Sequence, residues 1–154
     1  MSETKVIGID LGATNIRAGL VHEGNIHTIQ SKRIKSAGTV EEVLADFYLL
    51  IDTLLDNEVV AIGIGVPSVV DLAKGIVYDV QHIPSWKEVP LKEILEKKYK
   101  LPVYVNNDAN CFALGEFHFG KGRGKSDMIG LSIGTGLGGG AIVNKHLFAG
   151  SNCG

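Results

Sequence analysis

The chain has 154 residues, 45% of them hydrophobic, and it carries a formal net charge of −2 at pH 7. This composition excludes a disordered chain, and the small net charge provides no attraction to nucleic acid or to an anionic membrane. No apolar run approaches the roughly 20 residues of a membrane span, and the two cysteines form no CxxC pair, so we expect a soluble, cytoplasmic protein without nucleic-acid or membrane partners.

Three apolar runs separated by tight turns open the chain: Lys5–Asp10, Ile16–Val21 and Ile26–Arg33. They predict three successive antiparallel strands. Thr39 and Glu42 then form a capping box in front of apolar residues at helical spacing. The pattern predicts a helix from about Val40 to Asp56.

The middle of the chain alternates between strand and helix patterns. A buried strand is predicted over Val59–Val66, and the irregular stretch Val69–Val89 predicts a short hairpin or an extended loop. Pro90 suits the first turn of a helix. A short strand over Leu101–Val105 and a helix over about Ala109–Phe119 follow.

The glycine-rich, basic stretch Gly120–Lys125 marks a plausible domain boundary. After it, strands over Met128–Ile133 and Ala141–Val143 repeat the strand–glycine turn–strand order of the beginning. The whole order predicts an α/β fold with a mixed sheet and flanking helices. We expect a first domain over residues 1–122 and the first strand pair of a second, similar domain over 123–154.

Two glycine-rich turns each lie between two predicted strands: Gly8-Ile9-Asp10-Leu11-Gly12-Ala13-Thr14-Asn15 and Gly134-Thr135-Gly136-Leu137-Gly138-Gly139-Gly140. A glycine-rich turn with threonine can present backbone N–H groups and a hydroxyl to a polyanion. One such turn alone is equally well explained as a tight hairpin that needs φ > 0. The second turn matches GxGxxG, but a strand follows where the dinucleotide fingerprint requires a helix. Two turns together predict a clamp on the phosphates of a nucleotide.

Two aspartates stand near these turns. Asp10 ends the first predicted strand, where it could hold Mg²⁺ or its waters beside bound phosphate. Asp108 follows an apolar strand and begins a helix, so its carboxylate is expected at a sheet edge. Either Asn107 or Asp108 could simply cap that helix. Asp108, kept ionised by the helix N-terminus, could equally accept the proton of a substrate hydroxyl, and the two roles are compatible.

These parts together resemble the ROK sugar kinases, a family that includes bacterial glucokinases, fructokinases and N-acetylhexosamine kinases. Ile9–Asn15 is similar to the first phosphate motif of the family, Gly134–Gly140 to the second, and Asn106–Asn110 to the segment with the catalytic aspartate. The resemblance covers the whole chain in order. It implies a ribonuclease H-like fold of the actin/hexokinase type, in which two domains close over ATP and sugar.

The resemblance implies transfer of the γ-phosphoryl group of ATP to a hydroxyl of a hexose or N-acetylhexosamine. Asp108 would accept the hydroxyl proton, Asn107 would bind a neighbouring hydroxyl, and Asp10 would organise Mg²⁺. The nucleotide would be held by residues of the two turns: Gly8, Asp10, Gly12, Ala13, Thr14, Asn15, Gly134, Thr135, Gly136, Gly138, Gly139 and Gly140.

Two positions depart from the family pattern. Ser68 and Val69 stand where the family usually has Gly-Pro, and His82 takes the place of a sugar-contacting asparagine. We expect Ser68 and His82 to lie at the sugar. From the residues alone, His82 and Trp86 could equally pack over the sheet edge without touching a ligand.

The family continues past this region with a sugar-binding glutamate and histidine and often a zinc-binding cysteine cluster. We therefore expect the N-terminal half of such a kinase, nearly inactive alone, with any zinc site in the missing part and a homodimer as a possible state of the full-length protein. The alternatives are a sugar-sensing regulator or a non-catalytic sugar-binding relative. In the regulators a helix-turn-helix precedes the first motif, and Met1–Lys5 leaves no room for one.

Overall fold

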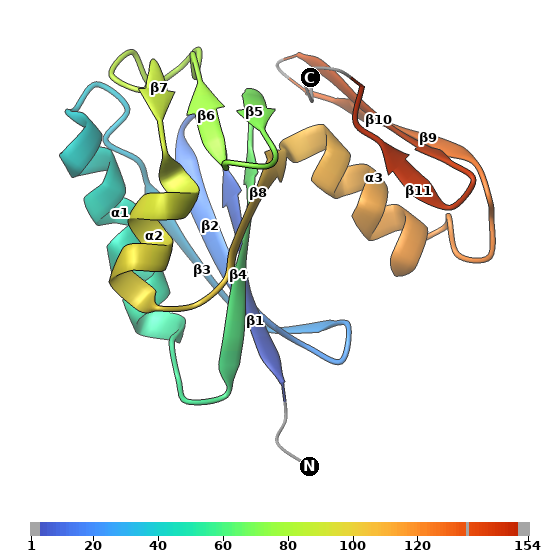
Figure 1. Cartoon of the computed structure of the whole chain (residues 1–154), viewed down its shortest axis with the longest axis horizontal. Helices are drawn as coiled ribbons and strands as arrows, with labels where there is room; N and C mark the ends of the chain where they lie inside the picture. Colours follow the sequence, from blue (N-terminus) through green and yellow to red (C-terminus); the bar gives the residue numbers. More distant parts are fainter. Residues whose placement is uncertain (1–3, 135, 151–154) are drawn as a thin grey trace.

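A five-stranded mixed sheet organises the N-terminal part of the computed structural model, which describes residues 4–134 and 136–150 (Figure 1). The strand order is β3-β2-β1-β4-β8. Strands β1, β2 and β3 are antiparallel, as predicted, and β1, β4 and β8 are parallel. Their bounds are Lys5–Leu11 for β1, Asn15–His22 for β2, Asn25–Arg33 for β3, Val59–Val66 for β4 and Val103–Asn107 for β8.

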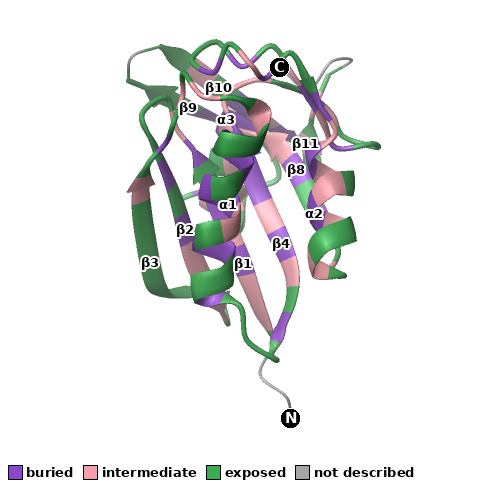
Figure 2. Ribbon diagram, turned by 90° about the vertical axis from the view of Figure 1, so that its left-hand side faces the viewer, coloured by how far each residue is buried: buried purple, intermediate pink, exposed green. Residues whose placement is uncertain are grey.

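Helices α1 (Val40–Leu54) and α2 (Leu91–Tyr99) cover one face of this sheet (Figure 1). The core lies between them and the strands, as the buried positions in Figure 2 show. Trp86 is fully buried there and stacks on Phe47, with 5.6 Å between the ring centroids. Of the two roles considered for Trp86, packing is the one the structure confirms.

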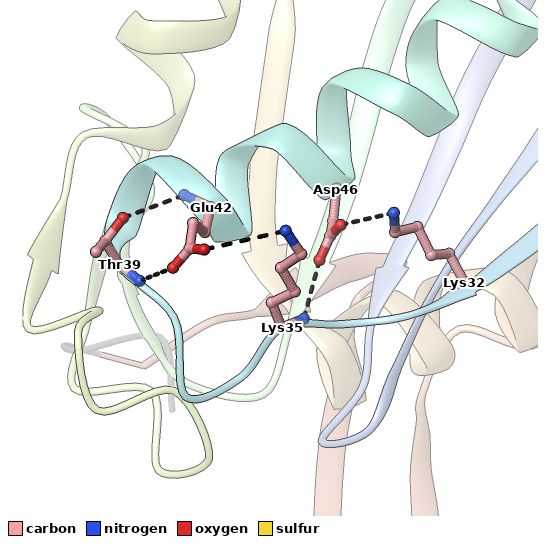
Figure 3. A network of polar contacts seen from close by, with 5 residues as sticks. All are labelled: Lys32, Lys35, Thr39, Glu42 and Asp46. Atoms are coloured by element: carbon pink, nitrogen blue, oxygen red, sulfur yellow. Dashed lines mark hydrogen bonds and ion pairs between the residues drawn. The ribbon is translucent and has the colours of Figure 1, made fainter.

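The start of α1 is fastened by a polar network (Figure 3). Thr39 Oγ1 accepts a hydrogen bond from Glu42 N, and Thr39 N donates to Glu42 Oε2, which confirms the predicted capping box. Asp46, only 1% exposed, accepts from Lys35 N at 2.9 Å and pairs with Lys32 Nζ at 3.0 Å. The network holds the loop between β3 and α1 against the helix.

The stretch expected to hold a hairpin or a loop forms a small antiparallel sheet, β5-β6-β7. The strands are Val69–Asp71, Ile76–Tyr78 and Glu88–Val89. The hairpin prediction is confirmed for β5 and β6, and β7 adds a third strand that the pattern did not indicate. This sheet stands at the carboxyl ends of β1, β4 and β8 (Figure 1).

The C-terminal part contains α3 (Asp108–His118) and an antiparallel sheet of order β11-β10-β9. Strand β9 is Met128–Ile133, β10 is Leu137–Val143 and β11 is His146–Phe148. This part lies on the side of the first sheet opposite α1 and α2 (Figure 1). Within residues 4–134 and 136–150, no helix combines the length and the apolar character needed to cross a membrane.

Strand β10 begins earlier than predicted, at Leu137, so Gly138, Gly139 and Gly140 belong to a strand and not to the turn. The ladder with β9 extends to the pair Leu137–Ile133, and β10 also packs closely on α3. A Cβ built at Gly140 would lie 2.7 Å from Ala113 Cβ, and one at Gly138 would lie 3.0 Å from Ala109 Cβ. The helix therefore requires glycine at 140 and leaves little room for a side chain at 138.

Helix α3 contacts both sheets. On its other side, a Cβ built at Gly65 of β4 would lie 3.5 Å from Cys111 Sγ. The helix therefore fixes the second sheet beside the first. The division of the chain after residue 122 stays a prediction.

Candidate active site

A cleft of about 1710 Å³ lies between the first sheet, the N-terminus of α3 and the β9–β10 turn. It brings together most of the residues that the sequence singled out. Those lining it are Gly8, Asp10, Gly12, Ala13, Ser68, His82, Asn107, Asp108, Gly134, Gly136, Gly138 and Gly139.

Three expected residues of the described part of the chain are not among those that line this cleft, and a fourth cannot be placed. Thr14 and Asn15 lie in and after the first turn, where the Thr14 carbonyl accepts from Ile34 N at 3.0 Å. Gly140 lines a neighbouring hollow of about 230 Å³, together with Asn107. Thr135 lies outside the described residues. Whether these four touch a nucleotide stays a prediction.

The first glycine turn is closed by a hydrogen bond from Gly12 N to the Asn15 carbonyl oxygen, at 2.9 Å. A Cβ built at Gly12 would lie 2.9 Å from the same oxygen, so a side chain would force the turn open. Among the described residues of the two turns, no glycine has positive φ. The alternative of a hairpin that needs a left-handed glycine is therefore wrong for the first turn.

The second turn differs from the first. Gly134 N donates to the Gly136 carbonyl oxygen at 2.9 Å. Apart from its chain neighbours, no described residue has an atom within 4 Å of a Cβ built at Gly134 or Gly136. Neither backbone conformation nor packing against the described part of the chain requires glycine at these two positions.

Asp10 faces a residue that sequence reasoning missed. Asp10 of β1 and Arg17 of β2 are directly paired across the antiparallel ladder, and both are exposed and line the cleft. Partners opposite each other in such a ladder project from the same face. A hairpin whose turn is centred between Ala13 and Thr14 pairs residues 10 and 17, so the signal was present in the sequence. The site thus holds one cationic side chain beside the carboxylate.

Of the two candidate caps, Asn107 and not Asp108 is the N-cap of α3. Its Oδ1 accepts from Ala109 N at 2.9 Å and from Asn110 N at 3.3 Å. Its Nδ2 donates to the Ser68 carbonyl oxygen at 3.3 Å. Asp108 is the first residue of the helix and also accepts from Ala109 N, at 2.8 Å.

Partial burial raises the pKa of the Asp108 carboxyl, and the negative charge of Asp10 acts in the same direction. The hydrogen bond from Ala109 N lowers the pKa, but its effect is smaller than that of burial. Desolvation thus outweighs the hydrogen bond at the helix N-terminus in setting the direction of this shift in pKa. A carboxylate with a raised pKa is a stronger proton acceptor than an ordinary aspartate.

The other side of the cleft carries Ser68 and His82. The Ser68 hydroxyl donates to the Tyr78 carbonyl oxygen, so it is engaged within the fold. His82 is exposed and lies beside Gln81 in the loop between β6 and β7. No group of three or more His, Cys, Asp or Glu side chains that could hold a metal ion is found in the described ranges.

A model of the ROK family matches residues 6–154. A glucokinase of Streptomyces coelicolor is 39% identical over 143 residues, which cover 92% of this chain and 44% of that protein. A xylose repressor of Caldicellulosiruptor bescii is 36% identical over 153 residues, or 95% of this chain and 38% of the repressor.

Among solved structures, the ROK family glucokinase of Streptomyces griseus in complex with glucose and AMPPNP superposes with a TM-score of 0.86. It is 36% identical, and the match covers 97% of this chain and 47% of that one. The chain thus spans about half the length of the glucokinases that it matches, or slightly less.

Proposed function

The chain belongs to the ROK family, and we therefore propose that the protein of which it forms part is an ATP-dependent sugar kinase. Its fold is the ribonuclease H-like, actin/hexokinase type with a mixed sheet and flanking helices, as expected from the sequence. The reaction would transfer the γ-phosphoryl group of ATP to a hydroxyl of a hexose or N-acetylhexosamine.

One observation carries the proposal: a single cleft is lined by both aspartates and by glycines of both turns. Gly134 and Gly136 support it further, since no described contact explains why they are glycine. Glycine at an open position lets a backbone approach a ligand closely. Phosphoryl transfer depends on positioning and on charge neutralisation more than on covalent chemistry, which suits such a set of groups.

On the nucleotide side, the two turns would hold the phosphates. Arg17 would place a guanidinium beside them, in the manner that arginine neutralises transferring phosphoryl groups. The donor set fits Mg²⁺, because this ion keeps several waters and binds through one or two carboxylates together with substrate phosphates. Asp10 would hold it, directly or through its waters, and the bound ion would neutralise charge on the phosphates.

On the acceptor side, Asp108 would take the proton from the attacking sugar hydroxyl. Its raised pKa suits this role, because a general base works best when its pKa is brought toward the working pH. Asn107, Ser68 and His82 would surround the sugar. Asn107 uses its oxygen to cap α3, so the remaining N–H of its amide would be the group offered to a substrate hydroxyl.

A second candidate is a sugar-responsive regulator, because a xylose repressor matches 95% of the chain. The two functions differ in turnover. A regulator would bind sugar without consuming ATP, and its response would not depend on Asp108 as a base.

A coupled assay of ADP release on the full gene product, with a panel of hexoses and N-acetylhexosamines, tests the proposal. We expect turnover with at least one sugar and a loss of at least about 10²-fold in kcat for Asp108→Asn, the typical contribution of a general base. Asp56→Asn makes the same chemical change on an exposed residue next to β4, at the end of the strand away from the cleft, and should leave turnover intact. Turnover with no sugar, or equal turnover in the two variants, would refute the kinase mechanism.

A further inference from the structure

Ser68 makes hydrogen bonds to two other walls of the cleft. Its hydroxyl donates to the Tyr78 carbonyl oxygen, and its own carbonyl oxygen accepts from Asn107 Nδ2 at 3.3 Å. Tyr78 is the last residue of β6, and Asn107 is the cap of α3. One side chain and one carbonyl group therefore connect the corner between β4 and β5 with both β6 and α3.

The hydrogen bond to Tyr78 fixes the point at which the loop that carries His82 begins. Residues 69 and 78 form the last pair of the β5–β6 ladder, and the Ser68 hydroxyl adds one more bond beyond it. Asp79 follows with a positive φ of 44°, where the chain leaves the strand. A hydrogen bond from Asp79 N to the Lys87 carbonyl oxygen, at 3.0 Å, closes the loop. Its position in the cleft thus depends on how Tyr78 is held.

The bond from Asn107 fixes the start of α3. The Asn107 side chain can cap the helix only in one orientation, with Oδ1 toward Ala109 N and Asn110 N. In that orientation its Nδ2 meets the Ser68 carbonyl oxygen. Asp108 is the next residue, so the same bond constrains the place from which its carboxylate projects.

We propose that Ser68 is a positioning residue, which holds the His82 loop and the first turn of α3 in a fixed relation across the acceptor side of the cleft. It acts through Tyr78 on His82 and through Asn107 on Asp108. A glycine, which the resembled family usually has here, lacks the hydroxyl and cannot make the first of these bonds. The inference rests on the proposed function for its kinetic effect, but not for its structural one.

The kinetic test compares Ser68→Ala with Ser68→Thr, which keeps the hydroxyl, in the full gene product. We expect kcat/KM for the sugar to fall about tenfold in Ser68→Ala, as for loss of one hydrogen bond in a partly buried site, with KM for ATP unchanged. Ser68→Thr, because it keeps the hydroxyl, should lose less kcat/KM than Ser68→Ala. Ser36→Ala, in the loop before α1 and outside the cleft lining, is the matched control. Equal kinetics in Ser68→Ala and Ser36→Ala would overturn the proposal.

A second measurement needs no turnover and separates this inference from the proposed function. The hydrogen exchange of the Asp79 backbone amide, which closes the His82 loop next to Tyr78, should become about tenfold faster by NMR in Ser68→Ala and stay unchanged in Ser36→Ala. Asn107→Asp keeps the cap oxygen but loses Nδ2. The effects of Ser68→Ala and Asn107→Asp on kcat/KM should therefore be less than additive in the double variant. Unchanged exchange, or strict additivity, would overturn the role of Ser68 even in an active kinase.

Discussion

The negative charge of Asp10 acts on Asp108 across the cleft and raises the pKa of the Asp108 carboxyl, in the same direction as burial does. A group whose pKa is raised on folding binds its proton more tightly in the folded state. The ionised carboxylate of Asp108 thus opposes folding, and this cost is present above the folded-state pKa and absent below the unfolded-state pKa.

We therefore expect Asp108→Asn to raise the thermal midpoint near pH 7 while it abolishes turnover. The gain should shrink as the pH falls and vanish once the parent carboxyl is protonated in both states. Thermal unfolding followed by circular dichroism between pH 3 and pH 7 would measure it. Asp56→Asn should instead lower the thermal midpoint near pH 7, because the hydrogen bond from Lys5 lowers the pKa of the Asp56 carboxyl. A destabilised Asp108→Asn at pH 7 would contradict the expectation.

Gly140→Ala tests the packing of β10 on α3. The new methyl group would lie 2.7 Å from Ala113 Cβ and 2.8 Å from the Ala109 carbonyl oxygen. Both neighbours are fixed in a helix and cannot move aside alone. We expect a loss of about 1–3 kcal/mol in the free energy of unfolding, the usual cost of overpacking, measurable by urea titration. A neutral result would mean that α3 and β10 are less closely packed.

Gly134→Ala tests the open part of the same motif. Apart from its chain neighbours, the added Cβ meets no described residue within 4 Å, and φ is not positive, so stability should change by no more than about 0.5 kcal/mol. If the turn approaches phosphate, the methyl group should instead raise KM for ATP. Equal KM values for Gly134→Ala and the parent would exclude close contact between this position and the nucleotide.

Arg17→Ala removes the cation opposite Asp10. The Arg17 side chain is exposed in the cleft, so we expect little effect on stability but a fall of about 10²-fold in kcat, comparable to loss of one electrostatic stabiliser. Arg17→Lys keeps the charge without the planar fork and should recover only part of the rate. Steady-state kinetics at saturating ATP measure both. A wild-type kcat in Arg17→Ala would remove Arg17 from the proposed site.

The ion pair between Lys32 and Asp46 predicts that removing the cation costs more stability than removing the anion. Lys32→Met leaves a carboxylate that is 1% exposed without its ion-pair partner, at a cost of up to about 3–5 kcal/mol. Asp46→Asn removes the buried charge itself, and the Lys32 ammonium can reach water, so the loss should be smaller. Lys35→Ala, whose pair with Glu42 is exposed at 4.0 Å, should cost less than about 1 kcal/mol. Urea titrations of the three variants would reveal the order.

The sequence predicted the strand and helix order well because its signals are local. Apolar periodicity, the Thr39 capping box and the glycine turns each depend on a few neighbouring residues. Most of the residues expected at the cleft also line it, since the carboxyl ends of the parallel strands β1, β4 and β8 meet at one edge.

The features that the sequence did not predict depend on contacts between distant segments. The Ser68 hydroxyl is engaged by a carbonyl ten residues away, which no spacing rule indicates. Desolvation of Asp108 depends on residues distant in the sequence, so the raised pKa of its carboxyl could not be read from the helix start alone. Gly138 and Gly140 could not be told from turn glycines until α3 was placed over β10.

The glycines of the second motif thus divide into two classes with different tolerance of change. Those at 138 and 140 are constrained by the helix that presses on them, whatever ligand the protein binds. Gly134 and Gly136 have no such constraint from the described residues. Under the proposed function, substitution at the turn would change how the nucleotide is held, while the adjoining strand keeps its glycines and the fold stays the same.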